Sequence, residues 1–381
     1  MAVPYFRLDL GQSEIDAVVA VLKSGWLTTG PECAAFEKEF AEALGGGVQA
    51  IAVNSNTSGM HLALEAAGIG PGDEVIVPDL TFTATAEVVR YMGAEVVLVD
   101  VLPDTLCMDP QEVERSITPR TKAILPVHFG GLGAAMDELL AIAARHGLVV
   151  IEDAAHAFPA SKGGVAIGRH GTLATVFSFY ANKTITTGEG GMIVTADEKI
   201  AQRCRTMRLH GIDRDAFRRF QGDSAAWQYD IVAPGFKYNL TDIAAALGRK
   251  QLARAVEMRN SRAVIADVYR KGLADLPIEM PPDSAEGDLH AWHLFPIRLA
   301  VGASINRAQL ETALAAAGIG YSVHYTPLHR MTYWHERYGL SDNRFPVATS
   351  HFERCVSLPL FSAMREDEAE EVISVIRRTL T

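Results

Sequence analysis

Short apolar runs alternate with stretches of helical spacing through the first half of the chain. The apolar runs are rich in β-branched residues and cover Gln49–Asn54, Glu74–Pro78, Glu95–Val101, Lys122–Val127 and Leu148–Glu152; the helical stretches are Gly59–Ala67, Thr85–Met92, Pro110–Ser116 and Met136–His146. Strands that alternate with helices in this way pair in parallel, which predicts an α/β fold with a mainly parallel sheet. Ligands of such sheets lie beyond the carboxyl ends of the strands, so the residues that follow the strands are the candidates for a site.

The last third of the chain predicts a smaller α+β domain. A long helix beginning near Thr241 and ending near Gly272 leads into it. Its other expected elements are strands at Trp292–Leu299 and Gly320–Tyr325, helices at Asn306–Ala317 and Glu366–Leu380, and a loop at Pro327–Asn343. We therefore predict two domains, residues 1–255 and 256–381, with the boundary inside the long helix and an N-terminal segment that can pack on the smaller domain.

Composition excludes several classes of function. A formal net charge of −11 argues against nucleic acid as a partner, since neutralising phosphates needs a basic surface. The N-terminus lacks the basic and apolar regions of a signal peptide, and no apolar run is long enough to span a bilayer. The four cysteines are isolated and the histidines show no metal-binding spacing, which predicts a cytoplasmic protein with reduced thiols and no metal site.

Lys183 lies between two apolar runs, Thr175–Tyr180 and Met192–Thr195, and is followed by the glycine-rich turn Gly188–Gly191. Most lysines in loops are ordinary surface residues. A lysine held at the edge of a buried sheet is different, because desolvation favours the neutral, nucleophilic amine that forms a Schiff base.

Other polar and aromatic residues follow the predicted strands. Asp153 and His156 come directly after one strand, and Phe82 comes after another. A carboxylate leaving a buried strand needs a cation or several hydrogen bonds. Asp153 can therefore pair with an arginine or with a protonated ring nitrogen, while His156 and Phe82 can be core residues or can contact a ligand.

Hydroxyl groups near a helix N-terminus complete a possible cofactor site. Thr57 and Ser58 lie where a strand gives way to a helix, a position that suits either an ordinary N-cap or a bound phosphate. Ser178 can add a third hydroxyl. A lysine, a carboxylate, an aromatic ring and hydroxyl groups are what pyridoxal 5′-phosphate requires of its protein, so we predict that cofactor.

Six blocks of sequence carry a resemblance to a known family. They are SGWLTTGP (Ser24–Pro31), NTSGMHLAL (Asn56–Leu64), GDEVIVPDLTF (Gly72–Phe82), VIEDAAHA (Val150–Ala157), FSFYANKTITTGEGGMIVT (Phe177–Thr195) and GFKYNLTDI (Gly235–Ile243). Together they resemble the DegT-type nucleotide-sugar aminotransferases, which depend on pyridoxal phosphate. The resemblance implies the aspartate-aminotransferase fold (type I), with a large domain around a mainly parallel, seven-stranded sheet and a smaller α+β C-terminal domain.

The resemblance also implies roles for individual residues. Lys183 would form the Schiff base, Asp153 would contact the pyridine nitrogen, His156 would lie near the ring hydroxyl and Phe82 on the ring face. These four residues would hold the ring itself.

The phosphate and the substrates follow from the same resemblance. Thr57, Ser58 and Ser178 would bind the phosphate, joined by Asn239 from the neighbouring subunit of a homodimer. L-glutamate would donate the amino group and a keto nucleotide-sugar would accept it. Within the family the likeness is greatest to the enzymes that aminate a UDP-linked 4-keto-pentose, giving UDP-4-amino-4-deoxy-L-arabinose for lipid A modification. A UDP- or TDP-linked 4-keto or 3-keto hexose is the alternative substrate.

Three other functions compete with this interpretation. Gly131-x-Gly133 follows a strand, with Asp153 about twenty residues further on, as in NAD-dependent dehydrogenases. Met136, however, replaces the small residue that close helix packing requires. Related sugar dehydratases have histidine in place of Lys183, and a non-catalytic regulator would not need Lys183, Asp153 and His156 together.

Overall fold

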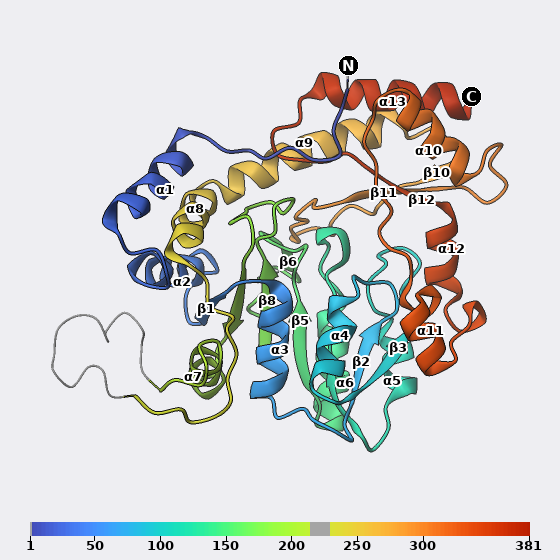
Figure 1. Cartoon of the computed structure of the whole chain (residues 1–381). Helices are drawn as coiled ribbons and strands as arrows, with labels where there is room; N and C mark the ends of the chain where they lie inside the picture. Colours follow the sequence, from blue (N-terminus) through green and yellow to red (C-terminus); the bar gives the residue numbers. More distant parts are fainter. Residues whose placement is uncertain (1, 214–228) are drawn as a thin grey trace.

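The structure, a computed structural model, describes residues 2–213 and 229–381. A seven-stranded sheet of order β1-β9-β8-β5-β4-β2-β3 forms the centre of the larger part of the molecule (Figure 1). Its strands are β1 (Gln49–Val53), β2 (Glu74–Pro78), β3 (Glu95–Val99), β4 (Thr121–Ile124), β5 (Val149–Asp153), β8 (Ala174–Ser178) and β9 (Gly191–Thr195). All neighbouring strands are parallel except β9, which is antiparallel to both β1 and β8. The expected α/β fold is confirmed.

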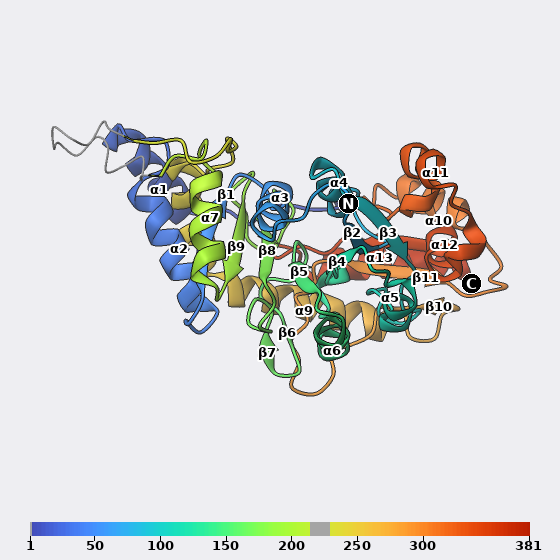
Figure 2. The ribbon, with the colours of Figure 1, turned by 90° about the horizontal axis from the view of Figure 1, so that it is seen from below.

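Helices cover both faces of this sheet. They are α2 (Pro31–Ala43), α3 (Asn56–Ala66), α4 (Ala84–Tyr91), α5 (Pro110–Ser116), α6 (Met136–His146) and α7 (Glu198–Met207). Helices α3 and α4 lie on one face, and α6 lies on the other (Figure 2). Successive side chains of β8 point to opposite faces of the sheet. Val176 packs in the apolar cluster under α3, and Phe177 packs on the other side with Phe36 and Phe40 of α2.

Helix α3 lies unusually close to the sheet. A Cβ atom added to Gly59 would lie 2.5 Å from Cγ1 of Val176, a distance that no side chain can occupy. Glycine is therefore required there by packing, and the close approach fixes where the N-terminus of α3 points.

A second apolar core lies around an antiparallel sheet of three strands, β10 (Ile278–Glu279), β11 (Phe295–Leu299) and β12 (Cys355–Leu358). Helices α10 (Arg307–Ala316) and α13 (Glu366–Leu380) pack on it. The expected strand Gly320–Tyr325 is wrong: its backbone makes only isolated contacts, with the amide of Gly320 donating to Val3 O and that of Ser322 to Ser357 O. The boundary between the two domains, placed after residue 255, stays a prediction.

The C-terminal chain also returns to the large sheet. The expected loop Pro327–Asn343 contains helix α11 (Thr332–Tyr338), which is followed by α12 (Pro346–Arg354). Trp334 and Phe345 from this region are buried in the core of the large sheet. The sequence did not predict α11, because a helix this short is stabilised by tertiary packing more than by its own composition.

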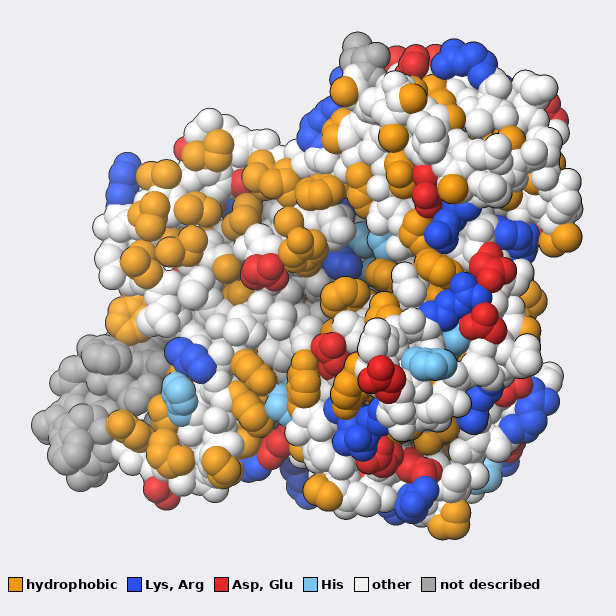
Figure 3. Space-filling model, turned by 45° about the vertical axis from the view of Figure 1, so that its right-hand side comes forward, with side chains coloured by type: hydrophobic (Ala, Val, Ile, Leu, Met, Phe, Trp, Pro, Cys, Tyr) orange, Lys and Arg blue, Asp and Glu red, His pale blue; other side chains and the backbone are white. Residues whose placement is uncertain are grey.

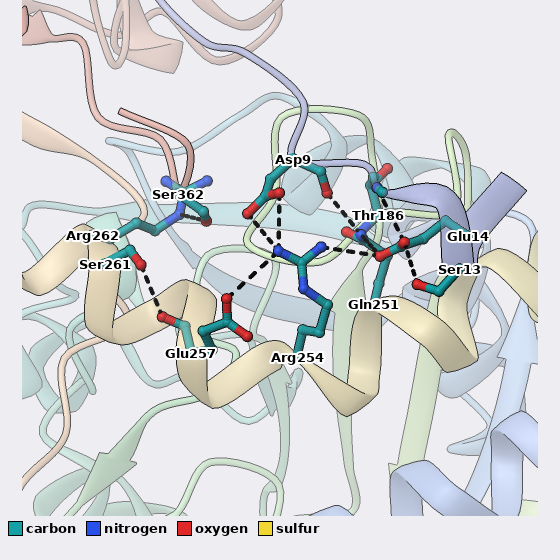
Figure 4. A network of polar contacts seen from close by, with 11 residues as sticks. Asp9, Ser13, Glu14, Thr186, Gln251, Arg254, Glu257, Ser261, Arg262 and Ser362 are labelled. Carbon is teal, nitrogen blue, oxygen red and sulfur yellow. Dashed lines mark hydrogen bonds and ion pairs between the residues drawn. The ribbon is translucent and has the colours of Figure 1, made fainter. Parts of the chain in front are cut away.

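The predicted long helix is broken. Helix α8 (Asp242–Ala253) ends and α9 (Ala255–Gly272) begins at Arg254, whose φ of −105° and ψ of 3° are not helical. The N-terminal segment, which leads into α1 (Gln12–Ser24), passes over this break, where Arg254 pairs with Asp9 and Glu14 (Figure 4). Within the described ranges, no helix combines the length and apolarity needed to cross a membrane.

Candidate active site

A cavity of about 480 Å³ opens beyond the carboxyl ends of β5 and β8. Figure 3 shows the hollow between two lobes of the surface, with a positively charged side chain and histidine on its floor. The predicted site residues that line it are Thr57, Phe82, Asp153, His156, Ser178 and Lys183. Its size is that of an ordinary cofactor or substrate pocket, and strands far apart in the sequence supply its residues.

Lys183 sits in a tight loop between β8 and β9. Its backbone N–H donates to Tyr180 O at 3.0 Å, and Thr187 N donates to Phe179 O at 3.0 Å, so hydrogen bonds hold the loop closed. Burial lowers the pKa of Lys183 to about 8, although Asp153 opposes the shift. At pH 7 a lysine of that pKa is neutral in roughly one molecule in ten, against about one in a few thousand for a free lysine.

Asp153 ends β5 and is 5% exposed. Its carboxylate accepts hydrogen bonds from Thr85 Oγ1 at 2.8 Å, Ala155 N at 3.1 Å and Asn56 Nδ2 at 3.3 Å. All three donors are neutral, and within the described residues no side chain forms an ion pair with Asp153. Burial raises the pKa of Asp153, and these hydrogen bonds oppose that shift only in part. The group is therefore a buried acid that a cationic ligand would stabilise.

Both ring nitrogens of His156 have hydrogen-bond partners. Its Nδ1 accepts from Gly130 N at 3.3 Å, and its Nε2 lies 3.0 Å from the hydroxyl of Tyr325. Burial, with the nearby charge of Lys183, lowers the pKa of His156 well below its usual value. The imidazole is consequently neutral with its proton on Nε2, and it donates to Tyr325.

The N-terminus of α3 faces the cavity. The helix begins at Asn56, earlier than predicted, because Ser55 caps it by accepting from Ser58 N at 3.0 Å. The hydroxyl of Ser58 is already engaged and donates to Ser55 O at 2.8 Å. Thr57 and Ser178, in contrast, both line the cavity, so their hydroxyls are the ones placed to meet a phosphate.

The last two predicted site residues are Phe82 and Asn239. Phe82 stands at the mouth of the cavity, 60% exposed, with its ring 6.1 Å from that of Tyr325. Asn239 does not line the cavity; its Nδ2 donates to Thr29 Oγ1 at 2.7 Å. Within one chain, Asn239 therefore holds the loop that contains Thr29.

Comparison with known proteins identifies the family. The model of the DegT/DnrJ/EryC1/StrS aminotransferase family matches residues 8–377. The chain belongs to this family. It is therefore an aminotransferase that depends on pyridoxal phosphate.

Relatives of this aminotransferase match along its whole length. The spore coat polysaccharide biosynthesis protein SpsC of Bacillus subtilis is 43% identical over 376 residues, which cover 98% of this chain and 96% of SpsC. DesV of S. venezuelae, solved in complex with a ketimine intermediate, is 34% identical with a TM-score of 0.89, and the match covers 99% of this chain and 98% of DesV. Spr1654 from Streptococcus pneumoniae, solved in its PLP-form, is 31% identical with a TM-score of 0.91, and all of both chains is covered.

The residues of this aminotransferase fit pyridoxal phosphate. Asp153 has only neutral hydrogen-bond partners and suits a protonated ring nitrogen. Lys183 has a lowered pKa and suits a covalent link to an aldehyde. Thr57 and Ser178 offer hydroxyls, and α3 offers its N-terminus. In the described part of the chain, no group of three or more His, Cys, Asp or Glu residues could hold a metal ion.

The dehydrogenase alternative is wrong. The turn after β4 forms a 3-10 helix at Phe129–Gly131, and Gly130 O accepts the backbone N–H of His293 at 3.0 Å. A Cβ on Gly131 would lie 3.0 Å from His156 O. These glycines allow close packing beneath the aminotransferase site, and their backbone does not form a dinucleotide-binding turn.

Sequence reasoning missed residues that the structure brings to this site. Asn56 and Thr85 hold Asp153, and Tyr325 holds His156. His293 Nε2 lies 3.5 Å from Lys183 Nζ, across 110 positions of sequence. The sequence places Thr85 at the start of a predicted helix and Asn56 in the turn before another, but no local pattern shows that they face Asp153.

The sequence also offers seven basic residues in or near predicted loops as candidates for binding substrate: Arg208, Arg214, Arg218, Arg219, His324, His329 and Arg330. Of these, His324 lines the cavity. Arg208 instead pairs with Glu37, Arg330 with Asp342, and His329 with Asp79. The other candidates, Arg214, Arg218 and Arg219, lie outside the described residues.

Proposed function

We propose that the enzyme transfers the amino group of L-glutamate to the keto carbon of a nucleotide-sugar. The observation that carries the proposal is the convergence of Lys183 and Asp153 on one cavity in a chain of this family. The two substrates would react in turn, with 2-oxoglutarate leaving before the sugar enters.

Each side chain has a distinct task in this proposal. Pyridoxal phosphate supplies an aldehyde for the amine and a ring that accepts electrons. Lys183 would hold the cofactor, and its neutral amine would then move a proton at the reacting carbon. Asp153 would hold the ring nitrogen and, while ionised, would favour its protonated form. His156 holds its Nε2 proton toward Tyr325, and Phe82 closes one side of the cavity.

The phosphate of the cofactor would be bound at the N-terminus of α3. Thr57 and Ser178 line the cavity there, and the helix dipole favours an anion. Ser58 would contribute chiefly by shaping this terminus, since its hydroxyl donates to Ser55 O.

A homodimer would complete the site, with Asn239 reaching the phosphate of the neighbouring subunit. Among the described residues, Lys183 is the only lysine or arginine that lines the cavity, yet glutamate and a nucleotide-sugar both carry negative charges. Apolar side chains are also exposed along the N-terminal segment and one side of α1, at Phe6, Leu8, Ile15, Val19, Leu22 and Leu27. A second copy would cover this surface and bring further cations.

The sugar proposed first is a UDP-linked 4-keto-pentose, aminated to UDP-4-amino-4-deoxy-L-arabinose for lipid A modification. The second is a UDP- or TDP-linked keto-hexose. The hexose is kept as the second candidate because SpsC is a spore coat polysaccharide biosynthesis protein and the 26% identical PseC of Helicobacter pylori is involved in the biosynthesis of pseudoaminic acid, neither of which is lipid A modification. The reaction would take place in the cytoplasm, where the four buried thiols remain reduced.

A substrate panel tests the proposal. Purified enzyme is given L-glutamate with UDP- or TDP-linked 4-keto and 3-keto sugars, and 2-oxoglutarate and the amino-sugar product are measured. We expect amination of the UDP-4-keto-pentose, with Lys183→Ala inactive and Lys199→Ala, a change of an exposed lysine on α7, fully active. Activity confined to a hexose would overturn the pentose assignment, and no activity with any keto-sugar would overturn the proposed function.

A further inference from the structure

Arg262, on α9, is a buried arginine without a carboxylate partner. Its side chain is 3% exposed. Its guanidinium donates to the hydroxyl of Ser362 at 3.1 Å and to the carbonyl oxygens of Leu360 at 2.8 Å, His293 at 3.5 Å and Asn182 at 3.5 Å. All four acceptors are neutral, and no aspartate or glutamate in the described part of the chain forms an ion pair with Arg262.

An unpaired buried charge is costly, and the same helical region contains a contrasting case. Arg254, at the break before α9, pairs with Asp9 and Glu14 (Figure 4). Arg262 lies two turns further along and contacts Ser362 in the same view. Removing a charge from water without a counter-charge destabilises the fold, so a neutral side chain would suit a purely structural role better.

Two of the carbonyl groups that accept hydrogen bonds from Arg262 belong to neighbours of Lys183, Asn182 and His293. Asn182 directly precedes Lys183 in the loop. His293 places its Nε2 3.5 Å from Lys183 Nζ, and its Nδ1 is buried without a hydrogen-bond partner. A single guanidinium thus contacts the backbone of two residues next to the amine, Asn182 and His293.

The charge of Arg262 also acts on the amine itself. Burial lowers the pKa of Lys183 most, Asp153 opposes this, and Arg262 lowers the pKa further. Burial likewise lowers the pKa of His293 well below its usual value, with Lys183, His156 and Arg262 adding to the effect, so the imidazole is neutral. A neutral imidazole can form a hydrogen bond with the amine of Lys183 without placing a second positive charge beside it.

We propose that Arg262 is a positioning residue for Lys183: it fixes Asn182 and His293 around the amine, and its uncompensated charge favours the uncharged, reactive form of that amine. The proposal rests on Lys183 being the reactive lysine of the proposed function. It does not depend on which sugar is used.

The test measures the amine in enzyme from which the cofactor has been removed. Such protein is treated with trinitrobenzenesulfonate over about pH 6 to 10, and labelling of the Lys183 peptide is followed by mass spectrometry. The wild-type midpoint should lie near pH 8. In Arg262→Met the midpoint should rise by about one unit, so labelling at pH 7 should be about tenfold slower. Arg262→Lys retains the charge and should keep the midpoint, but should bind pyridoxal phosphate more slowly because the hydrogen bonds are lost.

A second variant tests the charge without removing Arg262. Ser362→Asp places a carboxylate beside the guanidinium at a partly exposed position, and it should raise the Lys183 midpoint as Arg262→Met does. Arg259→Met is the matched control on α9, because Arg259 donates to His290 O outside this cluster, and it should leave the midpoint unchanged. If Arg262→Met does not fold, Ser362→Asp decides the question. An unchanged midpoint in the folded variants would overturn the proposal even if the aminotransferase activity is established.

Discussion

Replacing Asp153 with asparagine should make the protein more stable without cofactor and much less active with it. Asparagine has the same shape and can keep the local hydrogen bonds. Its oxygen can accept from Ala155 N and Asn56 Nδ2, while its amide donates to Thr85 Oγ1, which in turn donates to Phe82 O at 3.2 Å. Asp153→Asn therefore changes the charge and leaves the geometry in place.

Stability and activity should change in opposite directions because the carboxylate of Asp153 is buried. Burial raises the pKa of Asp153, so the ionised form destabilises the folded protein at every pH above the unfolded pKa near 4. Removing the charge should stabilise the cofactor-free protein by about 1 kcal/mol, a rise of about 1–2 °C in unfolding temperature. A charge pair in contact is worth about 4 kcal/mol at an effective dielectric of about 20, so loss of the pair with the ring nitrogen should lower turnover by about 10²–10³-fold.

Calorimetry of the cofactor-free protein and a coupled assay of 2-oxoglutarate formation measure the two effects. Thr85→Val is the matched control, because it removes one hydrogen bond from Asp153 but leaves the charge. It should lower stability and have a smaller effect on turnover. If Asp153→Asn lowered the unfolding temperature and left turnover within a few-fold of wild type, Asp153 would be a structural acid and the reasoning would be refuted.

Three further predictions concern other parts of the molecule. Borohydride reduction of the holoenzyme should attach one cofactor to Lys183, and Lys183→Arg should show no adduct by intact mass and at least about 10³-fold lower turnover. Although burial opposes it, Asp79 at 2.6 Å raises the pKa of His329, so this pair should stabilise the fold below about pH 6.5 and lose that effect as pH rises through the raised pKa of His329. The effect should also be lost at low pH where Asp79 takes up a proton, because burial raises the pKa of Asp79. His329→Gln should abolish the loss of stability above about pH 6.5 in thermal unfolding, and an unchanged profile would contradict the assignment. Gly59→Ala should destabilise the protein by about 1–3 kcal/mol and weaken cofactor binding, because its Cβ would lie 2.5 Å from Val176; unchanged urea unfolding would show that α3 can move away.

The sequence was informative wherever local chemistry determines local structure. Strands β1 to β5 follow from β-branched runs and the helices between them from their spacing, while the loop around Lys183 follows from two apolar runs and a glycine turn. The break at Arg254 could not be predicted, since arginine favours helices and the break accompanies ion pairs with Asp9 and Glu14 from the start of the chain. The mistaken strand Gly320–Tyr325 has strand-like composition, but its backbone contacts the N-terminal segment and β12 without forming a ladder.

The α/β class and the cofactor could both be inferred from the sequence, because Asp153 ends one strand, Lys183 lies in the loop after another, and the carboxyl ends of such strands must meet at one edge of the sheet. How those groups are held depends on the packing of distant parts of the chain. Thr85, His293 and Arg262 reach them from separate helices and loops, and the Arg262–His293 contact spans 31 positions. Such contacts depend on how helices, strands and loops far apart in the sequence pack together, so they cannot be predicted from patterns of neighbouring residues.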